Sequence, residues 1–209
     1  MMPTAEPVRD RVDARAFPRV AAYLDSLPEG LASYPGFKSK ASIYLALVAE
    51  LGVPLRTAGF PAKLAGLIDS PPTGNTWVPT VHVNAIELLI ADHLASSEAF
   101  VQLAYQMNRK LLGSAMYRPL VFVSSPAFLL KVSAMVWGRF HSGTVLRPRI
   151  EHNSARLDLS FPERLLPRLL LEDKATAYRA AAEAAGGREV TAVVEECSAD
   201  RARFALAWS

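Results

Sequence analysis

The segment from Ser124 to Gly143 constrains the fold of this chain most strongly, because helix signals stand at both of its ends. Ser125 is a good N-cap and Pro126 suits the first helical turn, while Ser142-Gly143 offers a stop. At about 100° per residue, the apolar side chains between these ends spread around most of the circumference. We therefore predict one helix of roughly four turns that is buried on nearly every side.

The hydrophobic period changes after this segment, from about 3.6 residues to 2. Helices are predicted at 17–27, 39–51, 61–68, 78–94, 97–112 and 171–185, and strands at 145–151, 156–161, 190–197 and 202–208. The helices 78–94 and 97–112 are expected to form a hairpin. The fold class is therefore α+β: a helical N-terminal portion followed by a β-β-α-β-β unit, which forms a four-stranded antiparallel sheet backed by helices.

A chain of 209 residues suits a single domain, 1–209, in which we expect a flexible tail (1–16), a helical portion (17–142) and a sheet portion (143–209). No uncharged run near the central helix reaches the length of about 18 residues that a spanning helix needs, so we expect no membrane span. The single cysteine, Cys197, excludes an internal disulfide and suits a cytoplasmic protein. We interpret Cys197 as a small buried apolar residue.

The first predicted hairpin carries alternating charges on one face and apolar residues on the other. If Asn153-Ser154 is a two-residue turn, Glu151 lies opposite Arg156. Pro148 cannot donate a ladder hydrogen bond, so its strand is expected at an edge of the sheet.

The second predicted hairpin turns around Ala199-Asp200 and sets Glu196 opposite Arg203. The same register places Glu195 on the inner, apolar face. Two interpretations follow: either the Glu195 carboxylate sits at the rim of the sheet, or the register is wrong by one residue.

The formal net charge of +3 raises the question of whether the protein binds nucleic acid. The excess lies in one segment, which contains Arg139, Arg147, Arg149, Arg156, Arg164 and Arg168 against Glu151, Asp158 and Glu163. Because acidic neighbours pair with these arginines and no aromatic residues are interleaved, we predict a solvated face and no nucleic-acid partner.

The predicted helix 78–94 contains histidine and acidic residues, which could bind a metal ion. His82 and His93 are eleven residues apart, which on a helix is about 16 Å along the axis and too far for one ion. His152 falls in a predicted turn and is expected to be solvated. No nucleophile elbow, Walker A loop or Gly-x-Gly-x-x-Gly motif is present in the sequence, so we predict neither a metal nor catalytic residues.

The C-terminal half resembles a known superfamily in the order of its elements and in several residues. These are Pro126, Trp137, Phe140-His141-Ser142-Gly143, two strands, a helix ending in Gly186-Gly187, two more strands and Trp208. This order is similar to that of heme-nitric-oxide-binding domains, vinyl-4-reductase-type domains and TRAPP core subunits. Within that superfamily it is closest to an uncharacterised myxobacterial paralogous family.

The resemblance implies a cavity between helices and sheet that takes heme, a small ligand or an acyl chain. The gas sensors hold heme propionates with a Tyr-x-Ser-x-Arg motif, and Ser154-Ala155-Arg156 lacks the leading tyrosine. We interpret His141 as a helix C-terminal residue that interacts with the helix dipole. No cofactor is therefore expected, and heme is judged absent. Cys197 lies too late in the chain for the TRAPP acyl cysteine.

The residues assigned to the ligand pocket are Met135, Trp137, Phe140, His141 and Tyr178. We predict a non-catalytic cytoplasmic module that senses a small apolar ligand or binds a protein partner, as a homodimer. The alternative is a heme-based gas sensor, or an enzyme whose site is scattered along the sequence.

Overall fold

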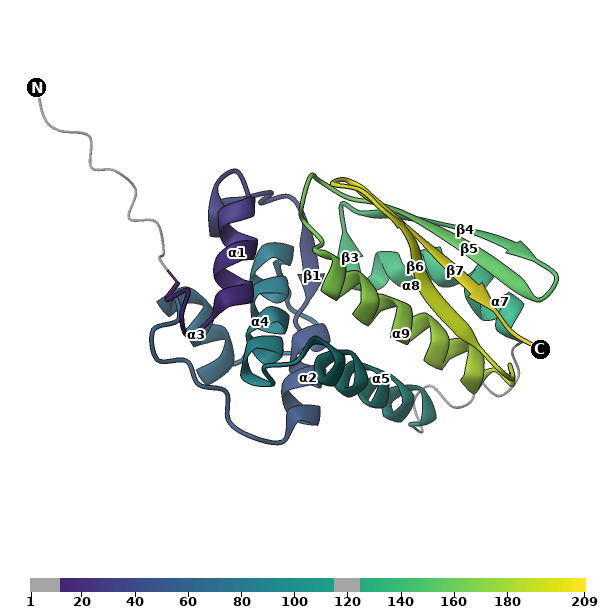
Figure 1. Ribbon diagram of the computed structural model, residues 1–209, viewed down its shortest axis with the longest axis horizontal. Helices are drawn as coiled ribbons and strands as arrows, with labels where there is room; N and C mark the ends of the chain where they lie inside the picture. The colour runs from purple at the N-terminus through teal and green to yellow at the C-terminus, as the bar shows by residue number, and fades with distance from the viewer. Residues whose placement is uncertain (1–11, 115–124) are drawn as a thin grey trace, which may run out of the picture.

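The computed structural model describes residues 12–114 and 125–209 (Figure 1), so most of the predicted tail lies outside the described residues. The fold is α+β, as predicted, with a helical N-terminal portion and a C-terminal sheet. In the described ranges, no helix is both long and apolar enough to cross a membrane.

The N-terminal portion is built from short helices around one buried helix, α4 (Figure 1). Its elements are α1 (Pro18–Ser26), η1 (Gly30–Ala32), β1 (Lys38–Lys40), α2 (Ser42–Leu51), α3 (Ala62–Asp69), β2 (Trp77–Pro79), α4 (Thr80–His93) and α5 (Ser97–Gly113). Every residue of α4 from Thr80 to Ala91 is buried, because α1, α2 and the sheet portion surround it. This helix is the centre of the molecule.

The prediction that the helices 78–94 and 97–112, now α4 and α5, form a hairpin is wrong. Ser96 caps α5 by accepting a hydrogen bond from the Ala99 N–H at 3.1 Å, and α5 then packs mainly along α9 (Arg168–Ala184) instead of returning along α4. Tyr105 donates a hydrogen bond to the Glu183 carboxylate of α9 at 2.6 Å. Helix α5 therefore joins the helical portion to the sheet portion.

The predicted central helix is two helices, α7 (Pro126–Lys131) and α8 (Ser133–Phe140). Ser125 caps α7 as predicted, but the helix breaks at Val132, where the Ser133 hydroxyl donates to the Leu130 carbonyl at 2.7 Å and competes with the regular helical bonds. The prediction of burial on nearly every side is also wrong. Phe128, Met135 and Val136 are exposed, because only one face of each short helix meets the rest of the protein.

A small sheet that the sequence did not predict joins distant parts of the chain. Strand β1 pairs antiparallel with β2 and with β3 (His141–Ser142), in the order β2-β1-β3. Residue Ser39 of β1 thereby lies beside His141, at the point where α8 ends. This sheet fixes His141 against the N-terminal helices.

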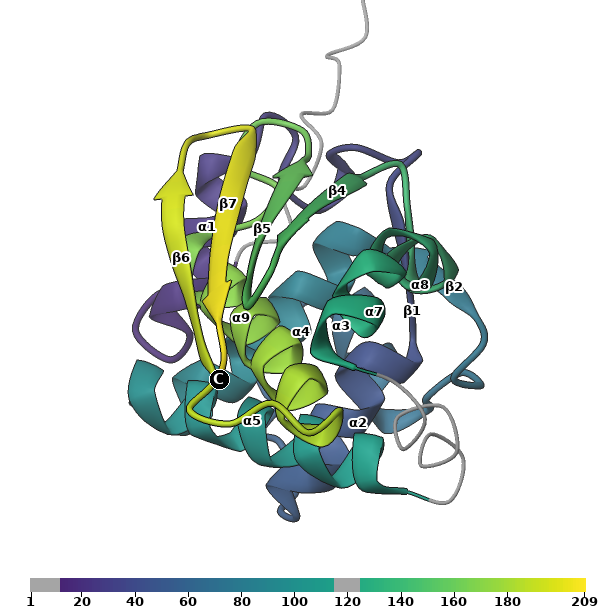
Figure 2. The ribbon, with the colours of Figure 1, turned by 90° about the vertical axis from the view of Figure 1, so that its right-hand side faces the viewer.

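The large sheet has the predicted four antiparallel strands, in the order β4-β5-β7-β6. Its strands are β4 (Val145–Glu151), β5 (Ser154–Ser160), β6 (Thr191–Cys197) and β7 (Arg201–Ala207). Helices α9, α7 and α8 cover one face, as Figure 2 shows, and the other face meets solvent. Leu157, Leu159 and Phe204 are fully buried on the covered face. Pro148 lies in the edge strand β4, which confirms that prediction.

The register of the first hairpin differs from the predicted one by two residues. Glu151 pairs with Ser154, so the turn is His152-Asn153, and His152 adopts a positive φ of 26°. A shift of two leaves every side chain on its predicted face, because strand side chains alternate with period 2. It changes the cross-strand partners: Arg149 lies opposite Arg156.

The second hairpin confirms the pairing of Glu196 with Arg203 and explains the difficulty with Glu195. A β-bulge lies between Val194 and Glu196, so Glu195 is the extra residue and its side chain is exposed. The interpretation of Cys197 as a buried residue is wrong. It is exposed, because it ends the edge strand β6 beyond the bulge.

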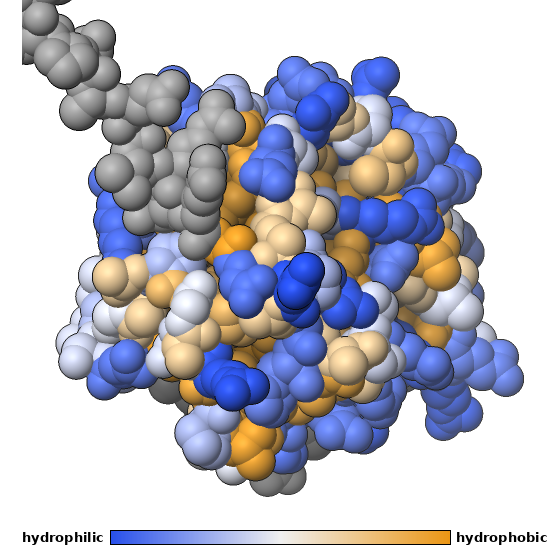
Figure 3. All heavy atoms as spheres, turned by 60° about the vertical axis from the view of Figure 1, so that its left-hand side comes forward, coloured by the Kyte–Doolittle hydropathy of each residue, from blue (hydrophilic) through white to orange (hydrophobic). Residues whose placement is uncertain are grey.

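The side of the molecule that carries α1 and α3 has a mixed surface. In Figure 3, apolar residues on this side are interrupted by hydrophilic ones and form no continuous apolar face.

Candidate functional site

Polar side chains form a stripe along the buried helix α4. Thr80, Asn84 and Glu87 are spaced i, i+4 and i+7 and therefore lie on one face, and each is no more than 3% exposed. A buried polar group costs free energy unless it has a partner. Each side chain of the stripe has one, and the partners come from β1, α1, α9 and the loop before α9.

Asn84, in the middle of the stripe, ties α4 to the loop before α9. Its amide donates to the Leu165 carbonyl at 2.7 Å and to the Tyr23 hydroxyl at 3.0 Å. Tyr23 donates in turn to the same Leu165 carbonyl at 2.9 Å. Burial raises the pKa of Tyr23 above its usual range, so this hydroxyl remains a donor.

At one end of the stripe lies His141. Its Nδ1 is 3.1 Å from the Ser39 Oγ, which is 3.0 Å from the Thr80 Oγ1. Burial lowers the pKa of His141 well below its usual range, and the positive charge of Lys174 lowers it further. The imidazole is therefore neutral. His141 is the C-cap residue of α8, as predicted, but it adds no positive charge to the end of that helix.

The His141 ring is also held from one face. The Trp137 indole stacks on it with ring centroids 3.8 Å apart, and the Trp137 Nε1 donates to the Thr144 Oγ1 at 2.9 Å. Gly143 lets this turn approach the N-terminal portion closely. A Cβ there would lie 2.6 Å from the nearest Phe37 ring atom, and φ is +92°. His141 is thus fixed in position and orientation.

The other end of the stripe is a buried ionic triad. The Lys174 Nζ lies 3.3 Å from the Glu87 carboxylate and 2.7 Å from the Asp173 carboxylate, and all three side chains are at least nine-tenths buried. Burial raises the pKa of Glu87 to about 7, although Lys174 acts in the opposite direction. Burial lowers the pKa of Lys174, but Asp173 and Glu87 outweigh it and keep the amine charged.

The triad predicts a pH dependence of stability. The folded-state pKa of Glu87, about 7, is above its ordinary value of 4.5. The stability that protonated Glu87 contributes is present below pH 4.5 and is lost as the pH rises through 7, on the order of 3 kcal/mol. Denaturant unfolding at pH 5 and pH 8 should show this loss in the wild type and much less of it in Glu87→Gln. An equal pH dependence in both proteins would contradict the assignment.

Of the residues predicted to line a pocket, the structure brings Trp137 and His141 together. Tyr178 is 8% exposed and packs edge-on against Phe204 at 5.2 Å, and Phe140 is half-buried. Met135 is 61% exposed. Among the described residues the Tyr178 hydroxyl has no hydrogen-bond partner. The assignment of these residues to a ligand pocket stays a prediction.

We call this site the buried polar cluster. The sequence did not predict which residues of the cluster contact one another. It comprises six buried residues, Ser39, Thr80, Asn84, Glu87, Asp173 and Lys174, together with the half-buried His141. The polar stripe along a buried helix was the available signal. Its contacts join residues 87 and 102 positions apart, which no local pattern reveals.

Comparison with known proteins finds similarity in structure only. No protein-family model and no curated protein sequence matches the chain. Among solved structures, an Fe(II) unliganded H-NOX protein variant from K. algicida has a TM-score of 0.53, at 9% identity, with 81% of this chain and 96% of that chain covered. The chain has an H-NOX-like fold. A T. tengcongensis H-NOX variant gives a TM-score of 0.51 at 9% identity, over 82% and 97% of the two chains.

This H-NOX-like fold corrects the expectation of no cofactor. Another similar structure, with a TM-score of 0.52, 9% identity and coverage of 80% and 99%, belongs to a study of heme redox potential and porphyrin distortion. A further one concerns heme distortion in the H-NOX family. The expectation that excluded heme depended on the absent Tyr-x-Ser-x-Arg motif and on the role given to His141 at a helix end.

The donor groups present fit an iron ligand at one position. A ligating histidine is neutral and has its second ring nitrogen fixed by a hydrogen bond. His141 meets both conditions, because its pKa is lowered and its Nδ1 lies 3.1 Å from the Ser39 Oγ. Its Nε2 makes no hydrogen bond to a described residue, in contrast to its Nδ1.

Proposed function

We propose that this domain is a heme-binding sensory module in which His141 is the protein ligand to iron. The observation that carries the proposal is the neutral, oriented imidazole of His141, placed within an H-NOX-like fold. When bound, heme iron supplies a coordination position for a small gas molecule. The chain's own residues would orient the ligand: Ser39, which contacts Thr80 through its hydroxyl, would hold Nδ1, and Trp137 would fix the ring plane.

The position of His141 gives the proposed sensor an output. His141 belongs to β3, which pairs with β1 of the helical portion, while the next strand, β4, belongs to the large sheet. A displacement of this imidazole would act on both sheets and, through Thr80, on α4. Sensing rather than turnover is the function that such a placement supports.

The expectations about a further ligand, a protein partner, the oligomeric state and the cellular location remain predictions. A small apolar ligand or a protein partner, a homodimer and a cytoplasmic location all suit a sensory module. Each of them can fail without affecting the heme proposal.

Heme reconstitution tests the proposal. We expect the purified protein to bind hemin in a 1:1 ratio with a Soret band, and His141→Ala to lose that stoichiometric band. His152→Ala is the matched control, because His152 lies in the exposed β4–β5 turn and should leave the band unchanged. Circular dichroism of each variant checks folding. Absence of the band in the wild type, or its full retention in a folded His141→Ala, would contradict the proposal.

A further inference from the structure

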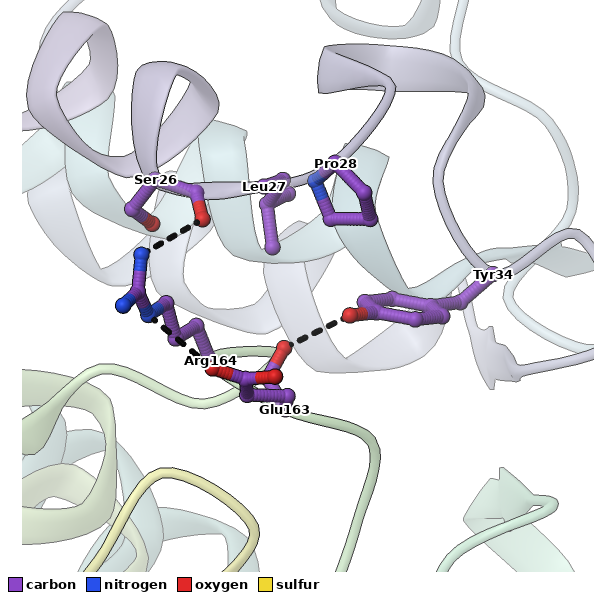
Figure 4. Close-up of a pocket in the computed structure, with 6 residues that line it drawn as sticks. All are labelled: Ser26, Leu27, Pro28, Tyr34, Glu163 and Arg164. Carbon is purple, nitrogen blue, oxygen red and sulfur yellow. Dashed lines mark hydrogen bonds and ion pairs between the residues drawn. The ribbon is translucent and has the colours of Figure 1, made fainter.

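A cavity lies where the loop after α1 meets the loop before α9, apart from the buried polar cluster. Its volume is about 220 Å³, and it is lined by Ser26, Leu27, Pro28, Tyr34, Glu163 and Arg164. In Figure 4, Leu27 and Pro28 lie on one side, the Tyr34 ring closes a second side, and Glu163 and Arg164 lie opposite Pro28. The cavity is thus built by two segments more than 120 residues apart.

The backbone on both sides of the cavity is in an unfavourable conformation. Tyr34 has φ of 54° and Arg164 has φ of 59°, in the left-handed region that is unfavourable for a non-glycine residue. Tertiary contacts hold both residues there. The Tyr34 hydroxyl donates to the Glu163 carbonyl at 2.8 Å, and the Arg164 N–H donates to the Ala199 carbonyl. Such strained residues concentrate at ligand sites.

The charged side chains of the cavity make only long contacts with other protein atoms. The Arg164 guanidinium lies 3.5 Å from the Ser26 carbonyl through Nη1 and 3.5 Å from the Glu163 carboxylate through Nε. Both distances are at the outer limit for a hydrogen bond, and a guanidinium has five N–H donors. The side chains of Arg164 and Glu163 are 60% and 65% exposed, so each can turn to a ligand.

We infer that this cavity binds a small zwitterion of the α-amino acid class. The ligand carboxylate would accept two hydrogen bonds from Arg164, its ammonium group would pair with Glu163, and its apolar side chain would lie against Leu27, Pro28 and the Tyr34 ring. The volume of about 220 Å³ is below the roughly 300–1,000 Å³ of sites for drug-sized ligands and suits a ligand of amino-acid size.

An NMR titration with L-leucine tests this inference. Two analogues serve as probes of the charged groups: 4-methylpentanoate lacks the ammonium group, and 3-methylbutan-1-amine lacks the carboxylate. We expect L-leucine to shift the amide signals of the lining residues and each analogue to bind about tenfold more weakly or worse. Equal affinity of 4-methylpentanoate would replace the zwitterion with a simple anion and so overturn the inference.

Single substitutions locate the binding. Arg164→Gln and Glu163→Gln should each weaken L-leucine binding by about tenfold or more. Arg168→Gln is the control, because Arg168 is an exposed arginine on the adjoining helix that pairs with Glu172. No signal change at tens of millimolar L-leucine, or unchanged affinity in folded Arg164→Gln, would overturn the inference. The result of the L-leucine titration does not depend on heme binding, because His141 is not among the residues that line the cavity.

Discussion

Lys174→Met is expected to lower the free energy of unfolding by about 3–5 kcal/mol, the cost of leaving buried charges without their partner. Lys174 is the only cation of the triad and contacts both Glu87 and Asp173. Methionine replaces its length and apolar stem but not its charge. Urea unfolding at pH 8, followed by circular dichroism, measures the difference.

Lys110→Met is the matched control for that measurement. Lys110 pairs with Glu50 at 2.6 Å, but its side chain is 72% exposed. Surface pairs contribute only about 0–1 kcal/mol, because water screens the charges and the side chains lose entropy. Equal losses in Lys110→Met and Lys174→Met would show that burial of the triad has no energetic consequence.

The triad also predicts how the cost of Lys174→Met depends on pH. Without Lys174, Glu87 loses the positive charge that lowers its pKa, so it takes up a proton more readily. The destabilisation should therefore be smaller at pH 5 than at pH 8. Adding Glu87→Gln to Lys174→Met removes one of the two unpaired carboxylates and should restore part of the loss at pH 8.

The large sheet could be predicted because its information is local. Alternation between apolar and polar residues gives each strand and the face it buries, and Pro148 gives the edge. Register depends on the turn, and His152-Asn153 and Asn153-Ser154 are both plausible two-residue turns. Only the first occurs, with His152 at a positive φ. The prediction therefore has the right faces and the wrong partners.

The central helix shows what local sequence information does not give. Its cap at Ser125 is local and was predicted, but its burial depends on what packs against it. Apolar residues all around a helix favour full burial, yet Met135 and Phe128 are exposed. Sequence periodicity gives no information on neighbours from other segments.

The candidate site lies beyond local reasoning for the same reason. The spacing of Thr80, Asn84 and Glu87 was visible in the sequence, but their partners come from α1, β1 and α9. Strand β1 has three residues, and β3 has two. Such short strands carry no alternating pattern, so the pairing that brings Ser39 to His141 had no sequence signal.

Trp137→Ala is expected to lower the free energy of unfolding by about 3–5 kcal/mol. The indole is 8% exposed, stacks on His141 and donates to Thr144, so truncation removes buried area, a ring contact and a hydrogen bond. Thermal or urea unfolding measures the loss. A loss below about 1 kcal/mol would instead identify Trp137 as the wall of an open cavity, because a side chain that lines empty space has few contacts to lose.

Met135→Ala is the control for Trp137→Ala, because Met135 lies two residues earlier in the same helix and is 61% exposed. It should change stability by about 0.5 kcal/mol or less. Neither substitution changes helix propensity by more than about 0.7 kcal/mol, so a larger difference between the variants reports packing. If Trp137→Ala remains folded, its His141 ring loses the stacking partner but keeps Ser39. If the proposed heme site is correct, heme binding should then weaken without disappearing, which would distinguish a residue that positions the proposed iron ligand from that ligand itself.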